Sequence, residues 1–179
     1  MKKSPLFSLC ATLLAAAALL LGVTWALCGI TERNARAQHH ALLQTLLPDS
    51  TQFVTEAYHG DDGNVLSVHR GETGYVVEAA TDGYAGTVSV MTGVSSSGAV
   101  TGLTVRRSHE TLGLGSRILR DEAFLSQFLG LSGEAEVGSN IDAITGATVS
   151  SRAVARCVNS AIAVVTGADI TTEATGWGG

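Results

Sequence analysis

A long apolar stretch dominates the N-terminal part of the sequence. Ser4 to Thr31 contains no charged residue over 28 positions and is rich in Leu and Ala. A helix needs roughly 20 apolar residues to cross the core of a bilayer. The pattern therefore predicts that residues 1–31 form a short cytoplasmic N-terminus and a single transmembrane helix.

Two alternatives treat the same stretch as a processed segment. Ala35-Arg36-Ala37 imitates a signal-peptide cleavage site, but the apolar run is far longer than the roughly 7–15 residues of the hydrophobic region of a signal peptide. A lipoprotein anchor at Cys28 fits less well, because bulky Trp25 stands where an aliphatic residue is expected. An uncleaved anchor is the favoured interpretation.

Helical spacing continues beyond the apolar stretch, from Glu32 to Leu47. Four leucines lie on neighbouring turns of this segment: Leu42, Leu43, Leu46 and Leu47. Pro48 ends the pattern, so the sequence predicts a helical stalk over residues 32–50.

Short β-type runs alternate with turns in the next part of the chain. The runs are Val65–His69, Gly74–Ala80, Thr87–Val94 and Ala99–Arg107. The last two are joined by Ser95-Ser96-Ser97-Gly98, and this arrangement predicts a β-hairpin.

Two further segments have the apolar spacing of helices. The first is Leu119–Leu129, whose apolar face consists of Phe124, Leu125, Phe128 and Leu129. The second runs from about Val149 to Val165 and ends at Gly167, and residues 171–179 are expected to be a disordered tail. Strands followed by helices predict an α+β domain over residues 51–170, with an antiparallel sheet packed by helices.

The charge distribution excludes one class of partner. From residue 31 onward, nine arginines stand against all 16 acidic residues, which gives this part a net charge of −7. Nucleic-acid binding needs clustered cations, and this distribution lacks them. The cysteines are Cys10, Cys28 and Cys157, and they form no cluster with histidine that would predict a zinc or iron–sulfur site.

Hydroxyl side chains gather just before the last helix, in the string Asp142-Ala143-Ile144-Thr145-Gly146-Ala147-Thr148-Val149-Ser150-Ser151. The N-terminus of a helix favours an anion such as phosphate, because its first N–H groups lack intrahelical acceptors. The simpler alternative is that a hydroxyl caps the helix for stability alone.

A second glycine-rich string follows the hairpin, from Ser108 to Arg117. It is not a dinucleotide-binding fingerprint, since Ile118 occupies the third glycine position, and the chain has no Gly-Lys-Ser/Thr of a P-loop. His109 and Glu110 are adjacent, so in an extended segment they point in opposite directions and make a poor acid–base pair. A serine hydrolase is not indicated either, because the Gly-x-Ser-x-Gly elbow is missing.

Three strings together resemble a known family. They are Gly83-Tyr84-Ala85-Gly86, then His109-Glu110-Thr111-x-Gly113-Leu114-Gly115, then Asp142-x-x-Thr145-Gly146-Ala147-Thr148. Over nearly its whole length the chain resembles the FMN-binding domain of the G subunits of Rnf electron-transport complexes, and the related C subunits of sodium-translocating NADH:quinone reductases. Leu112 departs from the pattern, since that family usually has proline there.

The resemblance implies a covalently bound cofactor. In that family FMN is joined through a phosphoester to the final threonine of the third string, which is Thr148 here. A separate flavin transferase attaches it from FAD, and Thr145 is the alternative acceptor. The resemblance also implies roles in recognition and phosphate binding for Asp142, Gly146, Ala147, Ser150 and Ser151, and ring contacts for Glu110, Thr111, Gly113, Leu114 and Gly115.

The resemblance further implies an electron carrier that is part of an enzyme and not an independent catalyst. It would belong to an ion-translocating ferredoxin:NAD oxidoreductase (Rnf) complex in the bacterial cytoplasmic membrane, with the FMN domain on the periplasmic or extracytoplasmic side. Its partners would be the other membrane subunits. Two alternatives remain: a cofactor-free extracytoplasmic scaffold, and an FMN domain of another exported electron-transfer system.

Overall fold

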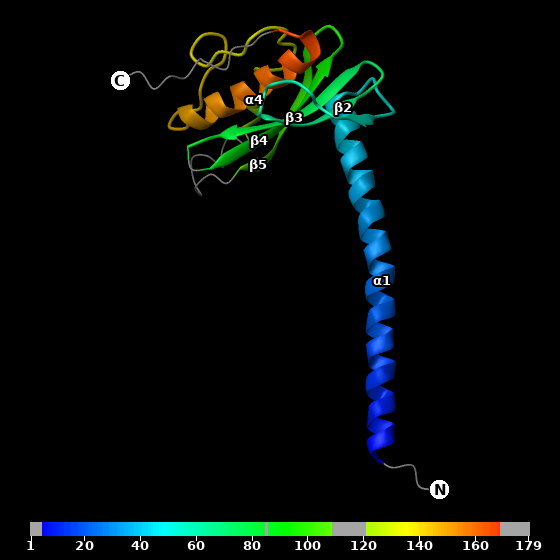
Figure 1. Ribbon diagram of the computed structural model, residues 1–179. Coiled ribbons are helices and arrows are strands. Elements are labelled where there is room, and N and C mark those ends of the chain that lie inside the picture. Colours follow the sequence, from blue (N-terminus) through cyan, green and yellow to red (C-terminus); the bar gives the residue numbers. More distant parts are fainter. Residues whose placement is uncertain (1–4, 85, 109–120, 169–179) are drawn as a thin grey trace. The chain divides into compact units, whose positions relative to one another are not determined.

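The computed structural model describes the backbone of residues 5–84, 86–108 and 121–168, and within them the side chains of 14–22, 34–84, 86–106 and 121–168 (Figure 1). The chain forms two compact units, Met1–Ala41 and Leu42–Gly179. Helix α1 (Pro5–Leu46) makes up most of the first unit and ends in the second. Across the described stretches, no helix combines the length and the apolar character needed to cross a membrane.

The described strands of the second unit form one antiparallel sheet in the order β1-β2-β3-β4-β5. Their bounds are β1 (Val54–Glu56), β2 (Val65–Arg70), β3 (Gly74–Asp82), β4 (Thr87–Ser95) and β5 (Val100–Ser108). The four predicted strands and the hairpin are confirmed. Strand β1 was not predicted, because three residues are too few to produce an alternating pattern.

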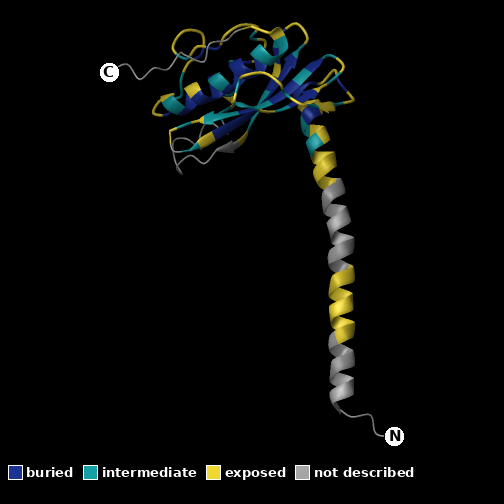
Figure 2. Ribbon diagram, viewed as in Figure 1, coloured by how far each residue is buried: buried dark blue, intermediate teal, exposed yellow. Residues whose placement is uncertain are grey.

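Helix α4 (Thr148–Thr166) covers one face of this sheet (Figure 1). Figure 2 shows buried positions along α4 where it meets the strands, and they include Val154, Val158 and Ala161. Gly167 ends the helix with a left-handed φ of 66°, as its position in the sequence predicted. Together, the sheet and the helix confirm the expected α+β class.

The helix predicted over Leu119–Leu129 is shorter in the structure. Helix α3 comprises only Glu122–Ser126, and residues 119 and 120 lie outside the described residues. After Ser126 the backbone continues in tighter turns, with Phe128 N–H donating to the Leu125 carbonyl at 3.2 Å. The apolar spacing nevertheless identified two core residues, because Phe124 and Phe128 are fully buried and stack edge-to-face at 5.3 Å. Leu129, predicted to share their face, is 51% exposed.

The opposite face of the sheet is covered at one end by the last turn of α1. Leu43, Leu46 and Leu47 pack there against buried Val76 and Met91. The backbone approaches closely, since Thr101 donates its hydroxyl to the Leu46 carbonyl at 2.6 Å. A Cβ on Gly93 would collide with that carbonyl, so glycine is required on β4 at this point.

Candidate functional site

Thr148 is the first residue of α4, and its side chain is exposed. The preceding Ala147 occupies the N-cap position, and no side chain caps the helix there. The first intrahelical hydrogen bond runs from Ser151 N–H to the Ala147 carbonyl at 2.9 Å, so the amides of Thr148 and Val149 precede the helical ladder. The alternative that a hydroxyl of this string caps the helix is therefore wrong.

The residues before Thr148 form a tight β-turn. Ala147 N–H donates to the Ile144 carbonyl at 2.9 Å, and Thr145 and Gly146 are the two central residues. Gly146, at the third position of the turn, has a φ of 80°. Residues with a Cβ rarely adopt this conformation, so glycine is favoured here. The glycine thus allows the chain to reverse directly into α4, while Thr145 and Thr148 remain exposed.

Ser151 holds this turn from the inside. Its hydroxyl accepts a hydrogen bond from Ile144 N–H at 3.1 Å and donates to the Ala147 carbonyl at 3.0 Å. Both Ser150 and Ser151 are buried, at 1% and 0% exposure, whereas the resemblance implied that they contact a phosphate. The structure gives Ser151 a different task, which is to fix the turn that presents Thr148.

Gln127, in the turn after α3, holds the other end of the loop. Its Oε1 accepts from Asp142 N–H at 2.7 Å, and its Nε2 donates to the Asp142 carbonyl at 3.3 Å. Gln127 and Asp142 also line a groove of about 510 Å³ together with Asp121, Ala123, Phe124, Ala143, Ile144 and Thr145. The groove therefore lies beside the turn that leads to Thr148.

Side-chain amides also satisfy the irregular segment before Asp142. Asn159 of α4 is buried and hydrogen-bonds both the N–H and the carbonyl of Ala135, at 2.8 and 3.1 Å. Asn140 accepts from Glu136 N–H at 2.7 Å and donates to the Glu134 carbonyl at 2.8 Å. Because this segment has little sheet pairing, these side-chain hydrogen bonds bind backbone N–H and carbonyl groups that would otherwise lack partners.

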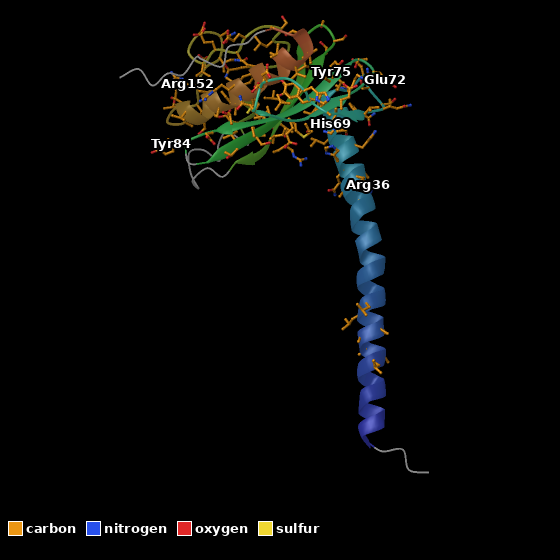
Figure 3. All side chains as sticks on the ribbon, viewed as in Figure 1. Arg36, His69, Glu72, Tyr75, Tyr84 and Arg152 are labelled. Atoms are coloured by element: carbon orange, nitrogen blue, oxygen red, sulfur yellow. The ribbon has the colours of Figure 1, made fainter. Side chains whose placement is uncertain are left out.

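The strand register brings two of the three recognised strings to one end of the sheet. Asp82 pairs with Thr87 around the Gly83–Gly86 turn, and Val88 pairs with Ser108, from which the glycine-rich string departs. Tyr84 in that turn is 78% exposed, and Figure 3 places it at the same end as Arg152 of α4. The predicted ring contacts Glu110, Thr111, Gly113, Leu114 and Gly115 lie outside the described residues.

Chemically, the described part of the site presents a hydroxyl that contacts no base. In the described part of the chain, neither a histidine nor a carboxylate is hydrogen-bonded to Thr148. Arg152 lies one turn further along α4 with an exposed side chain, and it has no ion pair among the described residues. This combination suits a residue that is modified by an external catalyst and then carries a negatively charged group.

Cys157, the cysteine of α4, is unsuited to chemistry. Burial raises the pKa of its thiol from 9.0 to about 12, and its Sγ lies 3.7 Å from the Val88 carbonyl. Because the thiolate is the reactive form, this cysteine is a packing residue.

The geometry fits the phosphate end of FMN. The exposed Thr148 hydroxyl lies at the N-terminus of α4, beside the backbone amides of Thr148 and Val149, which donate no intrahelical hydrogen bond. The exposed Arg152 lies one turn further along the helix. Gln127 and Asn159, which hold the segment that leads to this site, were not found from the sequence, because an amide that binds a distant backbone leaves no local pattern.

Comparison with known proteins gives a consistent result. Residues 83–163 match the FMN-binding domain family. The G subunit of the Na(+)-translocating ferredoxin:NAD(+) oxidoreductase complex of Acetobacterium woodii is 43% identical over 102 residues, which cover 51% of this chain and 48% of the relative. The G subunit of the ion-translocating oxidoreductase complex of Methanosarcina acetivorans is 35% identical over 139 residues, covering 70% and 73%. The corresponding G subunit of Escherichia coli O157:H7 is 39% identical over 97 residues, covering 48% and 47%, so the chain spans about half the length of two of these relatives.

Proposed function

The chain belongs to the family of FMN-binding G subunits of ion-translocating oxidoreductase complexes, and we propose that its Thr148 carries FMN through a phosphoester bond. The observation that supports this most strongly is the exposed Thr148 hydroxyl at the start of α4, which a fixed turn presents to solvent. Thr145 is exposed too, but it lies within the turn and not at the helix N-terminus.

FAD can donate the FMN group in the attachment step. The Thr148 Oγ would attack the phosphorus on the flavin side of the pyrophosphate, the P–O bond to the adenylate would break, and AMP would leave. The hydroxyl proton passes to a base on the flavin transferase, because no described base contacts Thr148. A threonine that lies in the open at a helix N-terminus is accessible to such an external enzyme.

Residues of this chain would hold the attached group. The amides at the start of α4 would bind the phosphate oxygens, and Arg152 would add a positive charge one turn away. When bound, FMN supplies one- and two-electron transfer between partners. Ring contacts from Glu110, Thr111 and Gly113 to Gly115, which follow β5, complete the proposed site.

A membrane anchor is also part of the proposal. The uncharged stretch Ser4–Thr31 is long enough to cross a bilayer. We propose that residues 1–31 hold the protein in the cytoplasmic membrane as a single-pass anchor, with the FMN domain on the extracytoplasmic side. The partners would be the other membrane subunits of a ferredoxin:NAD oxidoreductase complex, and covalent attachment would keep FMN from being lost to a dilute compartment.

The decisive test is a comparison of three proteins co-produced with a flavin transferase: wild type, Thr148→Val and Thr145→Val. We expect wild type and Thr145→Val to give a fluorescent band on a denaturing gel and an FMN mass increase on the peptide with residue 148. Thr148→Val should give neither, with an unchanged far-ultraviolet circular dichroism spectrum. A fluorescent Thr148→Val, or an unmodified wild-type peptide, would contradict the proposal.

A further inference from the structure

Besides Ser151 and the buried Ile141, one side chain outside the recognised strings helps to fix the loop that presents Thr148. Gln127 spans from the turn after α3 to Asp142, and it binds both backbone groups of that residue, at 2.7 and 3.3 Å. The backbone of Gln127 is held in place by its neighbours Phe124 and Phe128, which are 2% and 0% exposed and stack edge-to-face. The hydrogen bonds therefore join the first residue of the Asp142–Thr148 string to the hydrophobic core.

The two ends of the string are held in different ways. At its C-terminal end, Ser151 and the Ile144–Ala147 turn lock the backbone from within α4. At its N-terminal end, Asp142 is exposed, and the side-chain contacts described for its backbone come from Gln127. Ile141, just before the string, is buried and hydrogen-bonded through both its backbone groups, so loss of Gln127 would loosen only the short stretch of Asp142 and Ala143 while leaving the turn and α4 intact.

We propose that Gln127 is a positioning residue for flavin attachment: it holds the Asp142–Thr148 string in the conformation that the flavin transferase recognises. This inference rests on the proposed function, since it concerns the same acceptor, Thr148. A string held in one conformation binds an enzyme without first having to be ordered. When only a fraction of molecules has the competent conformation, the apparent affinity falls by that fraction, while the rate at saturation is retained.

Gln127→Met is the informative substitution. Methionine keeps the length and helix propensity of glutamine but makes neither hydrogen bond to Asp142. With the full-length protein in detergent, purified transferase and FAD, we expect the KM for the acceptor protein to rise roughly tenfold, the effect of losing two ordinary hydrogen bonds, with kcat within about twofold of wild type. Gln127→Glu retains an oxygen that accepts from Asp142 N–H, so it should show an intermediate KM.

Asn140→Ala is the matched control. Asn140 also makes two side-chain bonds to the backbone, at 2.7 and 2.8 Å, but to Glu136 and Glu134 and not to the acceptor string. Its loss should lower the melting temperature by about as much as Gln127→Met does, without the rise in KM. Amide hydrogen exchange should become faster at residues 142–143 in Gln127→Met and at 134–136 in Asn140→Ala.

Several results would overturn the inference. One is an unchanged KM in Gln127→Met, and another is a fall in kcat at unchanged KM, which would place Gln127 in the chemical step. An equal rise in KM for Asn140→Ala would reduce the effect to general destabilisation. Each of these leaves a labelled wild type and a modified Thr148 in place, so the proposed function would survive, whereas an unlabelled wild type would overturn both.

Discussion

Thr148 and Arg152 are four residues apart on α4, and both side chains are exposed. Residues with this spacing lie on the same face of a helix, about one turn apart. The second unit is acidic, since every side-chain carboxylate except that of Glu32 lies in it, so an arginine one turn from the proposed acceptor would add a local attraction for an incoming pyrophosphate. The attraction weakens with salt, because exposed charges are screened within about 10 Å at 0.1 M ionic strength.

We therefore expect Arg152→Gln to slow flavin attachment by about fivefold at low salt, the effect of one exposed charge pair. The difference from wild type should shrink as sodium chloride is raised. The measurement is the initial rate of fluorescent labelling at several salt concentrations. Arg70→Gln is the control, because Arg70 pairs with Glu56 on β1 and β2, and its loss should leave the labelling rate unchanged. Equal slowing in both variants would argue against a local role.

Among the secondary-structure elements, α4 was easy to predict and the segment before it was not. Thr148–Thr166 has continuous apolar periodicity and a terminal glycine, so the sequence defined both its type and its end. Residues 134–142 lack any such period: Asn159 and Asn140 hold the backbone of residues 134–136, and Gln127 holds that of Asp142. The contacts of Asn159 and Gln127 join residues 24 and 15 positions apart, so no short sequence window contains both partners.

Helix α3 shows that apolar spacing can identify core residues without predicting the length of the helix. The spacing of Phe124 and Phe128 correctly identified two core residues, yet the helix is only five residues long. Burial of one face is satisfied equally by an α-helical turn and by the tighter turns that follow Ser126. Apolar spacing therefore located the core but did not determine the hydrogen-bonding pattern.

The link between α4 and the preceding turn can be tested through Ser151. Ser151→Ala removes the acceptor of Ile144 N–H and one donor to the Ala147 carbonyl, which are both buried or half-buried. We expect the free energy of unfolding to fall by about 1–2 kcal/mol, measured by urea denaturation, and labelling of Thr148 to slow in parallel. Ser126→Ala is the control, because that exposed hydroxyl only returns a bond to Ala123 within α3, and its loss should be nearly neutral. If the two variants were equally stable, the role given to Ser151 would be wrong.

For the whole molecule, charge contributes little to the proposed orientation of the domain. Lys2 and Lys3 precede the uncharged stretch, and Arg33 and Arg36 follow it, so the charge bias is small. The proposal of an extracytoplasmic domain therefore depends on the family resemblance and the proposed covalent FMN more than on charge.

Reporter fusions at the C-terminus of the full chain test this topology. We expect an alkaline phosphatase fusion to be active and a green fluorescent protein fusion to be dark, because each reporter matures on one side only. The control is the same pair of reporters fused after residue 3. There the fluorescent protein should be bright and the phosphatase inactive. Strong cytoplasmic fluorescence of the C-terminal fusion would refute the proposed orientation.

The packing of Leu43, Leu46 and Leu47 against Val76 and Met91 has a practical consequence for anyone who studies this protein in solution. A water-soluble fragment that begins at Pro48, where the helical sequence pattern ends, would lose three core leucines. It would also expose the part of β4 around Gly93 that these leucines cover. Such a truncation would tend to self-associate, and its properties would differ from those of the intact domain. Fragments intended for redox titration should therefore start ahead of Leu42.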